Sequence, residues 1–176
     1  MPIKTIFLDR DGIINDVVIR DSVISSPRHP GEFHITEDFP HLYEVIRGLN
    51  LFVVTNQPDV SRKLLDESIL EKIHQSLQSR FEFREVAYCP HDDAAQCDCR
   101  KPKPGMILRL LEKYSLRPSE AVIIGDSGKD ILAGQAAGIR TVYCRRTYND
   151  PGDCHPDLTV DGLLEFAKLK EFFELR

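Results

Sequence analysis

Two aspartates separated by one residue follow the first apolar segment of the chain. Asp9 and Asp11 stand in the sequence FLDRDG, where Gly12 lets the backbone turn sharply. Two carboxylates this close repel each other unless a cation binds them, and a divalent ion suits oxygen ligands. One carboxylate could attack phosphorus while the other transfers protons. Asp and Gly are also common turn residues, so this motif alone favours a turn.

Two further motifs follow later apolar segments. Thr55 and Asn56 in VVTNQ offer a hydroxyl and an amide that could hold a phosphoryl oxygen, although an ordinary side-chain turn is the simpler interpretation. Asp126 in IIGDSGKD could complete a metal site with Asp9, or cap the helix that follows. Asp130 in the same motif could cap that helix or support the site from behind.

Three of the five cysteines lie within eleven residues, in the sequence YCPHDDAAQCDCRKP. Cys89, His91, Cys97 and Cys99 supply three thiolates and one imidazole, a common ligand set for structural zinc. The pairs are closer together than in a CxxC ribbon, and reduced surface thiols are the alternative. A loop with no other means of ordering favours zinc, and four protein ligands leave no open position for catalysis.

Arg100 and Lys101 come directly after this cluster. Zinc would hold both in place, and a fixed cation beside Asp9 could neutralise the charge of a phosphoryl group in transfer. A solvated basic cluster is the alternative. Cys144 and Cys154 have no such neighbours, so we expect a buried strand thiol and a loop thiol.

The elements that position these residues follow from hydrophobic periodicity. Short apolar segments rich in Ile and Val predict buried strands, and segments with helical spacing lie between them. Strands that alternate with helices indicate a parallel sheet, in which ligands bind beyond the carboxyl ends of the strands. The predicted strands are 3–8, 51–54, 86–88, 121–124 and 141–144, and the predicted helices are 39–49, 66–81, 106–116, 130–137 and 162 to the C-terminus.

Taken together, these motifs resemble the haloacid dehalogenase (HAD) superfamily of phosphatases. The matching sequences are LDRDG, VVTNQ, a basic residue before the fourth strand, and GDSGKD. The resemblance implies an α/β three-layer sandwich with a mainly parallel central sheet, HAD-like and Rossmann-like, formed as one domain over residues 1–176. No segment is long enough for a large cap domain, so we expect an open site with a zinc-binding loop at 89–99.

The resemblance also implies a mechanism. Asp9 attacks phosphorus and forms an aspartyl phosphate, and Asp11 acts first as acid and then as base. Magnesium is held by Asp9, the Asp11 backbone carbonyl and Asp126. Thr55, Asn56 and Lys101 bind phosphoryl oxygens, and Arg100 contacts the rest of the substrate.

The cysteine-rich loop resembles one subgroup of the superfamily. This subgroup contains D-glycero-D-manno-heptose 1,7-bisphosphate 7-phosphatase and the histidinol-phosphatase domain. The CRKP-x-PGM ending and the small size favour the heptose enzyme, whereas the five-residue gap between His91 and Cys97 favours the other. Ser127 stands where these relatives usually have Lys or Arg, so Lys129 or Lys103 could supply that contact. A polynucleotide 3′-phosphatase and a phospho-accepting receiver domain are the remaining alternatives; Asp11 argues against the receiver.

Composition limits the partners. A net charge of −5 argues against a nucleic-acid partner, and no apolar run is long enough to cross a membrane. The first residues lack the pattern of a signal peptide, so we expect a cytoplasmic protein. We also expect a monomer that acts on a small phosphorylated molecule. In the Pro-rich segment SSPRHPGEF, Arg28, His29 and Glu32 could contact substrate or belong to an ordinary surface loop.

Overall fold

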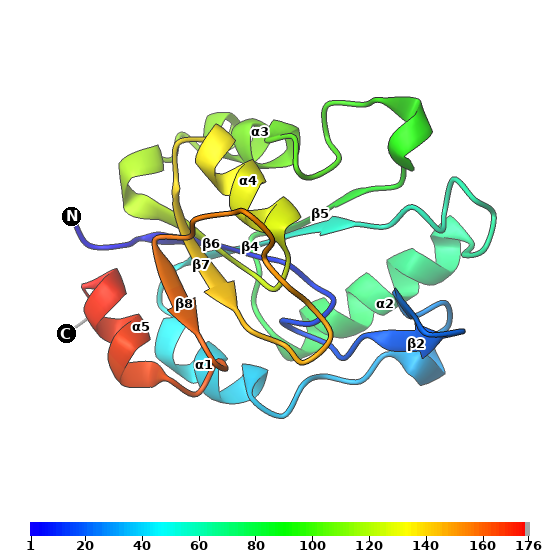
Figure 1. The fold of residues 1–176 in the computed structure, drawn as a ribbon, viewed down its shortest axis with the longest axis horizontal. Coiled ribbons are helices and arrows are strands. Elements are labelled where there is room, and N and C mark those ends of the chain that lie inside the picture. The colour runs from blue at the N-terminus through cyan, green and yellow to red at the C-terminus, as the bar shows by residue number, and fades with distance from the viewer. Residues whose placement is uncertain (175–176) are drawn as a thin grey trace.

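A computed structural model describes residues 1–174 of the chain. Its centre is a six-stranded sheet in which every neighbouring pair is parallel (Figure 1). The strand order is β5-β4-β1-β6-β7-β8, so the first strand lies at the middle of the sheet. The strands are β1 (Thr5–Leu8), β4 (Asn50–Asn56), β5 (Glu85–Cys89), β6 (Ala121–Gly125), β7 (Arg140–Cys144) and β8 (Leu158–Val160).

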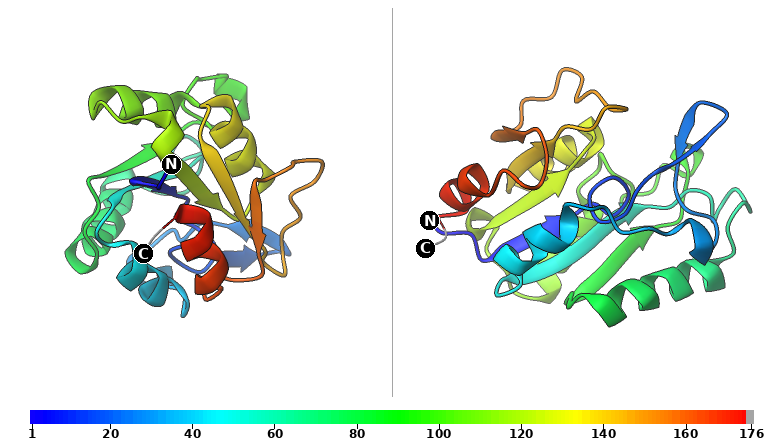
Figure 2. Two further views of the ribbon diagram at one scale, coloured as in Figure 1. Left: turned by 90° about the vertical axis from the view of Figure 1, so that its left-hand side faces the viewer. Right: turned by 90° about the horizontal axis from the view of Figure 1, so that it is seen from below.

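Helices cover both faces of this sheet and make three layers (Figure 2). One face packs on α1 (Phe39–Ile46), α2 (Glu67–Arg80) and α5 (Phe166–Phe173), and the other on α3 (Gly105–Lys113) and α4 (Gly128–Ala136). Successive side chains of a strand point to opposite faces, so Ile6 and Leu8 join the first core while Phe7 joins the second. Burial on both faces explains why these strands are continuous apolar segments. The predicted α/β three-layer sandwich is confirmed.

The elements predicted from periodicity are present, with ends that shift by a few residues. Two features differ from the prediction. Within the segment 16–38, for which no strand is predicted, an antiparallel hairpin forms from β2 (Val18–Arg20) and β3 (Val23–Ser25). The short strand β8 adds to the sheet beside β7. The last helix ends at Phe173, and the final two residues of its predicted range lie outside the described part of the chain.

The register of the central strands brings three chain segments to one edge. Leu8 of β1 pairs with Val53 of β4 on one side and with Ile124 of β6 on the other. The residues that follow each strand therefore come close together at the carboxyl edge of the sheet. Three short 3-10 turns, Pro30–Glu32, Asp93–Ala95 and Pro118–Glu120, complete the fold. Within residues 1–174, no helix combines the length and apolar character that crossing a membrane requires.

Candidate active site

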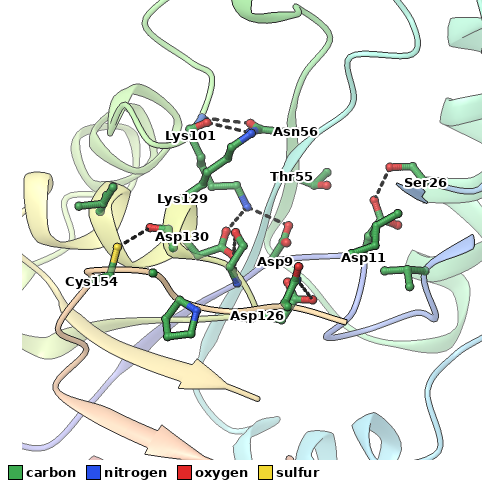
Figure 3. A pocket seen from close by; sticks show the side chains of 18 of the residues that line it. Asp9, Asp11, Ser26, Thr55, Asn56, Lys101, Asp126, Lys129, Asp130 and Cys154 are labelled. Carbon is green, nitrogen blue, oxygen red and sulfur yellow. Dashed lines mark hydrogen bonds and ion pairs between the residues drawn. The ribbon is translucent and has the colours of Figure 1, made fainter. Parts of the chain in front are cut away.

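A pocket of about 600 Å³ opens at the carboxyl edge of the sheet. Figure 3 shows its side chains converging from the ends of β1, β4 and β6 and from the loop that precedes α3. It has no large cap over it; the β2–β3 hairpin contributes Ile24 and Ser25 to one wall. Of the residues predicted for the site, it brings together Asp9, Asp11, Thr55, Asn56, Arg100, Lys101 and Asp126, and it adds Asp130 and Lys129.

Two carboxylates bind one buried ammonium group at the bottom of this pocket, and a third carboxylate lies close to them. The Lys101 Nζ donates to Asp9 Oδ1 at 2.8 Å, to Asp130 Oδ1 at 2.5 Å and to the Val54 carbonyl at 2.7 Å (Figure 3). Carboxylate oxygens of Asp9, Asp126 and Asp130 all lie within 4.8 Å of one another. Lys101 is 2% exposed, so one cation is held against three acidic groups.

This set of carboxylates carries more negative charge than Lys101 neutralises. Burial and the nearby Asp130 raise the pKa of Asp9 to about 8, although Lys101 opposes the shift. Burial and Asp130 likewise raise the pKa of Asp126 to about 7. Hard oxygen ligands of this kind fit Mg²⁺, which would relieve the repulsion. Asp11 is predicted to join through its backbone carbonyl; its side chain lies outside the carboxylate cluster.

Asp130 has a second role that the sequence analysis anticipated. Its Oδ2 accepts hydrogen bonds from the Ser127 backbone N–H at 3.1 Å and from the Ser127 hydroxyl at 2.8 Å. The Ser127 side chain in turn caps α4, which completes a capping box. Asp130 therefore fixes the start of α4 and Lys101 at the same time.

The last two residues of β4 have different tasks. Thr55 is buried at the pocket wall, and its hydroxyl accepts a hydrogen bond from the Gln57 amide at 3.0 Å. Both side-chain polar atoms of Asn56 bond to the Lys101 backbone, with distances of 2.9 Å to the carbonyl and 3.0 Å to the N–H. The Asn56 amide, predicted to hold a phosphoryl oxygen, thus positions Lys101 in this structure.

Asp11 is held by donors from four directions. The Arg10 guanidinium contacts both of its oxygens, with Nη2 at 2.9 Å and 3.1 Å. Asn15, Ser26 and Gln57 donate to it at 2.9, 2.7 and 2.8 Å. Burial alone would raise the pKa of Asp11, but the Arg10 charge and these hydrogen bonds lower it below its usual value. The sequence analysis identified Asp11 but none of these partners.

The loop between β7 and β8 holds Asp126, the residue that follows β6. The Tyr148 hydroxyl and the Asn149 amide both donate to Asp126 Oδ2 at 3.0 Å. Gly12, at φ +88°, lies so close that a Cβ there would collide with Asp126 and Tyr148, so only glycine fits. Arg146 anchors the loop through the Gly12 carbonyl at 2.7 Å and through Asp38. The sequence analysis did not identify this loop, because its residues do not form a motif like those that mark the ends of β1, β4 and β6.

The four predicted zinc ligands form one compact cluster. Sulfur–sulfur distances among Cys89, Cys97 and Cys99 are 3.0 to 3.5 Å, and His91 Nδ1 lies 3.6 Å from Cys89 Sγ and 3.4 Å from Cys99 Sγ. Ligand bonds of about 2.3 Å in a tetrahedron would separate sulfurs by roughly 3.8 Å, so a small relaxation admits the ion. The three cysteines are free thiols, and the donor set fits zinc. Cys144 is buried, as expected, and Cys154 lies at the pocket wall.

This cluster leads directly into the two basic residues of the pocket. The Arg100 Nη1 donates to the His91 carbonyl at 3.2 Å, and its Nε donates to Asp93 Oδ1 at 2.7 Å. Arg100 is 8% exposed and lines the pocket beside Lys101. Of the two cations expected to compensate for Ser127, Lys129 lines the pocket, whereas Lys103 donates to the Gln96 carbonyl at 2.8 Å outside it.

The Pro-rich segment reaches the pocket only through Ser25 and Ser26, at its start. Arg28 donates to Asp59 Oδ2 at 2.8 Å, and Glu32 accepts from Arg20 and from the Arg28 backbone N–H. His29 pairs with Glu32 and is largely exposed. None of the three lines the pocket, which favours the alternative of an ordinary surface loop. The charged side chains that made this segment resemble a binding loop form ion pairs within the protein instead.

Comparisons with known proteins agree with this geometry. The family model HAD-hydrolase-like matches residues 98–166. A D-glycero-beta-D-manno-heptose-1,7-bisphosphate 7-phosphatase of Neisseria meningitidis serogroup A is 32% identical over 94% of this chain and 93% of its own length. The D-glycero-alpha-D-manno-heptose-1,7-bisphosphate 7-phosphatase of Campylobacter jejuni is 31% identical over 97% of this chain and 99% of its own.

A solved structure shows the same fold. It is the D,D-heptose 1,7-bisphosphate phosphatase of B. bronchiseptica complexed with magnesium and phosphate, with a TM-score of 0.82 at 23% identity. The match covers 97% of this chain and 99% of that one. The relatives are phosphatases, which favours an enzyme over a phospho-accepting receiver domain.

Proposed function

We propose a substrate for this chain from the premise that it belongs to the haloacid dehalogenase superfamily of phosphatases, in the family of its heptose-1,7-bisphosphate 7-phosphatase relatives. It is a magnesium-dependent phosphoric monoester hydrolase. The substrate we propose is D-glycero-D-manno-heptose 1,7-bisphosphate, from which the enzyme removes the 7-phosphate. The relatives act on either anomer, so the anomer is left to experiment.

The chemistry begins at Asp9. Its carboxylate attacks phosphorus, the bond to the sugar oxygen breaks, and an aspartyl phosphate forms. Asp11 gives a proton to the departing oxygen and then takes one from the water that hydrolyses the intermediate. Lys101 and Thr55 face the transferring phosphoryl group, and the Asn56 amide holds the Lys101 backbone in place. Mg²⁺, held by Asp9, the Asp11 carbonyl and Asp126, would neutralise phosphoryl charge there.

One observation carries the choice of a bisphosphate. Two cations, Arg100 and Lys129, line the same pocket as Lys101. Lys129 makes no ion pair within residues 1–174, and the single partner carboxylate of Arg100, Asp93, is largely exposed. A second phosphate group of the substrate matches this pair. Histidinol phosphate, the alternative, has no second phosphate to offer them.

A phosphate-release screen tests this proposal. The substrates are both anomers of the heptose bisphosphate, histidinol phosphate and p-nitrophenyl phosphate. Replacing Arg100 by Ala should lower kcat/KM for the bisphosphate at least about tenfold, the effect of one lost charged contact, and change p-nitrophenyl phosphate much less. Arg109→Ala, an exposed position on α3, is the matched control. A preference for histidinol phosphate, unaffected by Arg100→Ala, would refute the bisphosphate.

We also propose that Cys89, His91, Cys97 and Cys99 hold one structural zinc ion. Four protein ligands complete a tetrahedron and leave no position for water, so the ion would order the loop rather than take part in the reaction. Elemental analysis of protein purified without added metal should give one zinc per chain. Absence of zinc together with freely reactive thiols at Cys89, Cys97 and Cys99 at neutral pH would overturn this assignment.

A further inference from the structure

A buried histidine lies behind the pocket and has no place in the chemistry described so far. His74 comes from α2 and is 6% exposed. Its Nε2 lies 3.0 Å from Nη1 of Arg10, and its ring packs against Tyr88 with centroids 5.5 Å apart. It does not line the pocket, so it cannot touch the substrate directly.

Arg10 connects this histidine to the site. Its side chain is fully buried, and its remaining donors, Nε and Nη2, all go to Asp11 at 2.9 to 3.2 Å. Arginine can only donate, so His74 Nε2 must accept, and its proton must be on Nδ1. Burial, together with the Arg10 charge, lowers the pKa of His74 to about 3, which agrees with a neutral acceptor.

We propose that His74 is a positioning residue for the reaction: it fixes the Arg10 guanidinium, which in turn orients the Asp11 carboxyl group toward the departing oxygen. The inference rests on the proposed acid role of Asp11. Asn15, Ser26 and Gln57 also hold Asp11, but each contacts it with one donor. Of these four residues, only Arg10 contacts both oxygens of the Asp11 carboxylate. Two hydrogen bonds from a planar guanidinium fix the orientation of that carboxyl group. His74 accepts a hydrogen bond from Nη1, the one Arg10 side-chain nitrogen that makes no hydrogen bond to Asp11.

The leaving group provides a readout that a purely structural role would not move. p-Nitrophenolate departs without a proton, whereas an alkoxide needs one. The ratio of kcat/KM for p-nitrophenyl phosphate to kcat/KM for a simple alkyl phosphate therefore reports how well Asp11 delivers its proton. Because kcat/KM covers only the steps up to departure of the alcohol, hydrolysis of the aspartyl phosphate does not affect it.

The variants are His74→Phe, which keeps a ring but removes the acceptor, and His74→Gln, which restores an acceptor oxygen. His74→Phe should raise the ratio about tenfold, Asp11→Asn should raise it further, and His74→Gln should return it toward the wild-type value. Leu70→Ala, one turn away on the buried face of α2, should destabilise the protein and leave the ratio unchanged. If His74→Phe does not fold, His74→Leu serves the same purpose.

Two outcomes overturn the inference, and they are distinguishable. In the first outcome, Asp11→Asn raises the ratio, whereas the His74 variants lower kcat/KM for both substrates equally or leave both values unchanged. His74 then has only a packing role. If Asp11→Asn itself leaves the ratio unchanged, the acid is another group, and the proposed role of Asp11 falls together with that of His74.

Discussion

Asp9 binds one cation and lies close to two other carboxylates. Its Oδ1 accepts from Lys101, while Asp130 and Asp126 lie on its other sides. We expect Asp9→Asn to lower kcat for p-nitrophenyl phosphate by on the order of 10⁴, because an amide is a poor nucleophile and a poor magnesium ligand.

A matched substitution checks that prediction. Asp161 is an exposed aspartate that pairs with Arg145 far from the pocket, so Asp161→Asn should leave kcat within twofold. Activity of Asp9→Asn within tenfold of the wild type would refute Asp9 as the nucleophile.

Residue types at strand ends were predictable from sequence, but their partners were not. Asp9, Thr55 and Asp126 all line one pocket because parallel strands end at one edge, and that follows from the pattern of segments. The contact between Asn56 and the Lys101 backbone joins residues 45 positions apart, and that between Arg10 and His74 joins residues 64 apart. Such contacts depend on how a loop and a helix pack, and no local pattern encodes them.

The loop between β5 and α3 couples its four ligand residues to the pocket. The His91 carbonyl accepts from Arg100, and Lys101 follows one residue later. We expect Cys97→Ser to loosen residues 89–104, since the ligand bonds supply most of the order of this loop. kcat/KM for the bisphosphate should fall about tenfold, as for a lost charged contact, and more than for p-nitrophenyl phosphate.

Limited proteolysis followed by mass spectrometry would locate the loosened segment. Cys154→Ser, which removes a thiol outside the cluster, should show no new cleavage in residues 89–104. Unchanged bisphosphate kinetics after confirmed loss of zinc would show that the loop keeps Arg100 in place without the ion.

The loop between β7 and β8 is anchored by an ion pair to the start of α1. Asp38 accepts from Arg146 at 2.9 and 3.2 Å and from the Leu163 backbone N–H at 3.1 Å. Burial would raise the pKa of Asp38, but Arg146 outweighs it and holds the value below the ordinary 3.8. Asp38→Asn should therefore lower the free energy of unfolding at pH 7 by about 2 kcal/mol.

The sign of the pH dependence follows from that lowered pKa. The unfolded chain binds the proton first as pH falls, so the contribution of Asp38 is present above about pH 4 and is lost below it. Urea unfolding from pH 7 to pH 3.5 should show the difference between wild type and Asp38→Asn narrowing. A difference that stays constant with pH would mean that packing, not charge, accounts for the effect.

Elements with strong periodicity were predicted within a few residues, and those without it were missed. β1, β4 and β6 are buried on both faces, so their central residues form continuous apolar segments. The β2–β3 hairpin exposes Ile19 and Val23 and turns through Asp21 and Ser22 at positive φ. Three-residue strands with exposed apolar side chains give no clear period, and β8 is formed mainly by its pairing with β7.

At the scale of the whole molecule, one chain brings all the proposed groups of the site to one pocket. The residues proposed as nucleophile, acid and phosphoryl ligands, and the carboxylate cluster, come from the segments after β1 and β6, from the end of β4 and from the loop before α3. The predicted monomer is compatible with this arrangement and stays a prediction. What holds these segments together is the sheet itself, so the repulsion among the three carboxylates acts directly against folding.

The last prediction concerns this repulsion. An aspartate whose folded pKa is about 8 rather than 3.8 binds its proton more tightly in the folded state. Stability of the metal-free protein should therefore fall as pH rises from about 4 to about 8. Mg²⁺ binds the carboxylate form, so its stabilising effect should be greatest at the upper end of this range.

Thermal unfolding with and without Mg²⁺ measures the effect. At a concentration 100 times its dissociation constant, the ion should add about 2.7 kcal/mol, or roughly 5–10 °C in Tm for a chain of this size. Asp126→Asn removes a ligand and should lose most of the shift at pH 8, whereas Asp161→Asn should keep it. Because zinc would occupy a separate cluster, Cys97→Ser should also keep the Mg²⁺ shift while starting from a lower Tm. An equal shift in Asp126→Asn would place the stabilising ion elsewhere on the molecule.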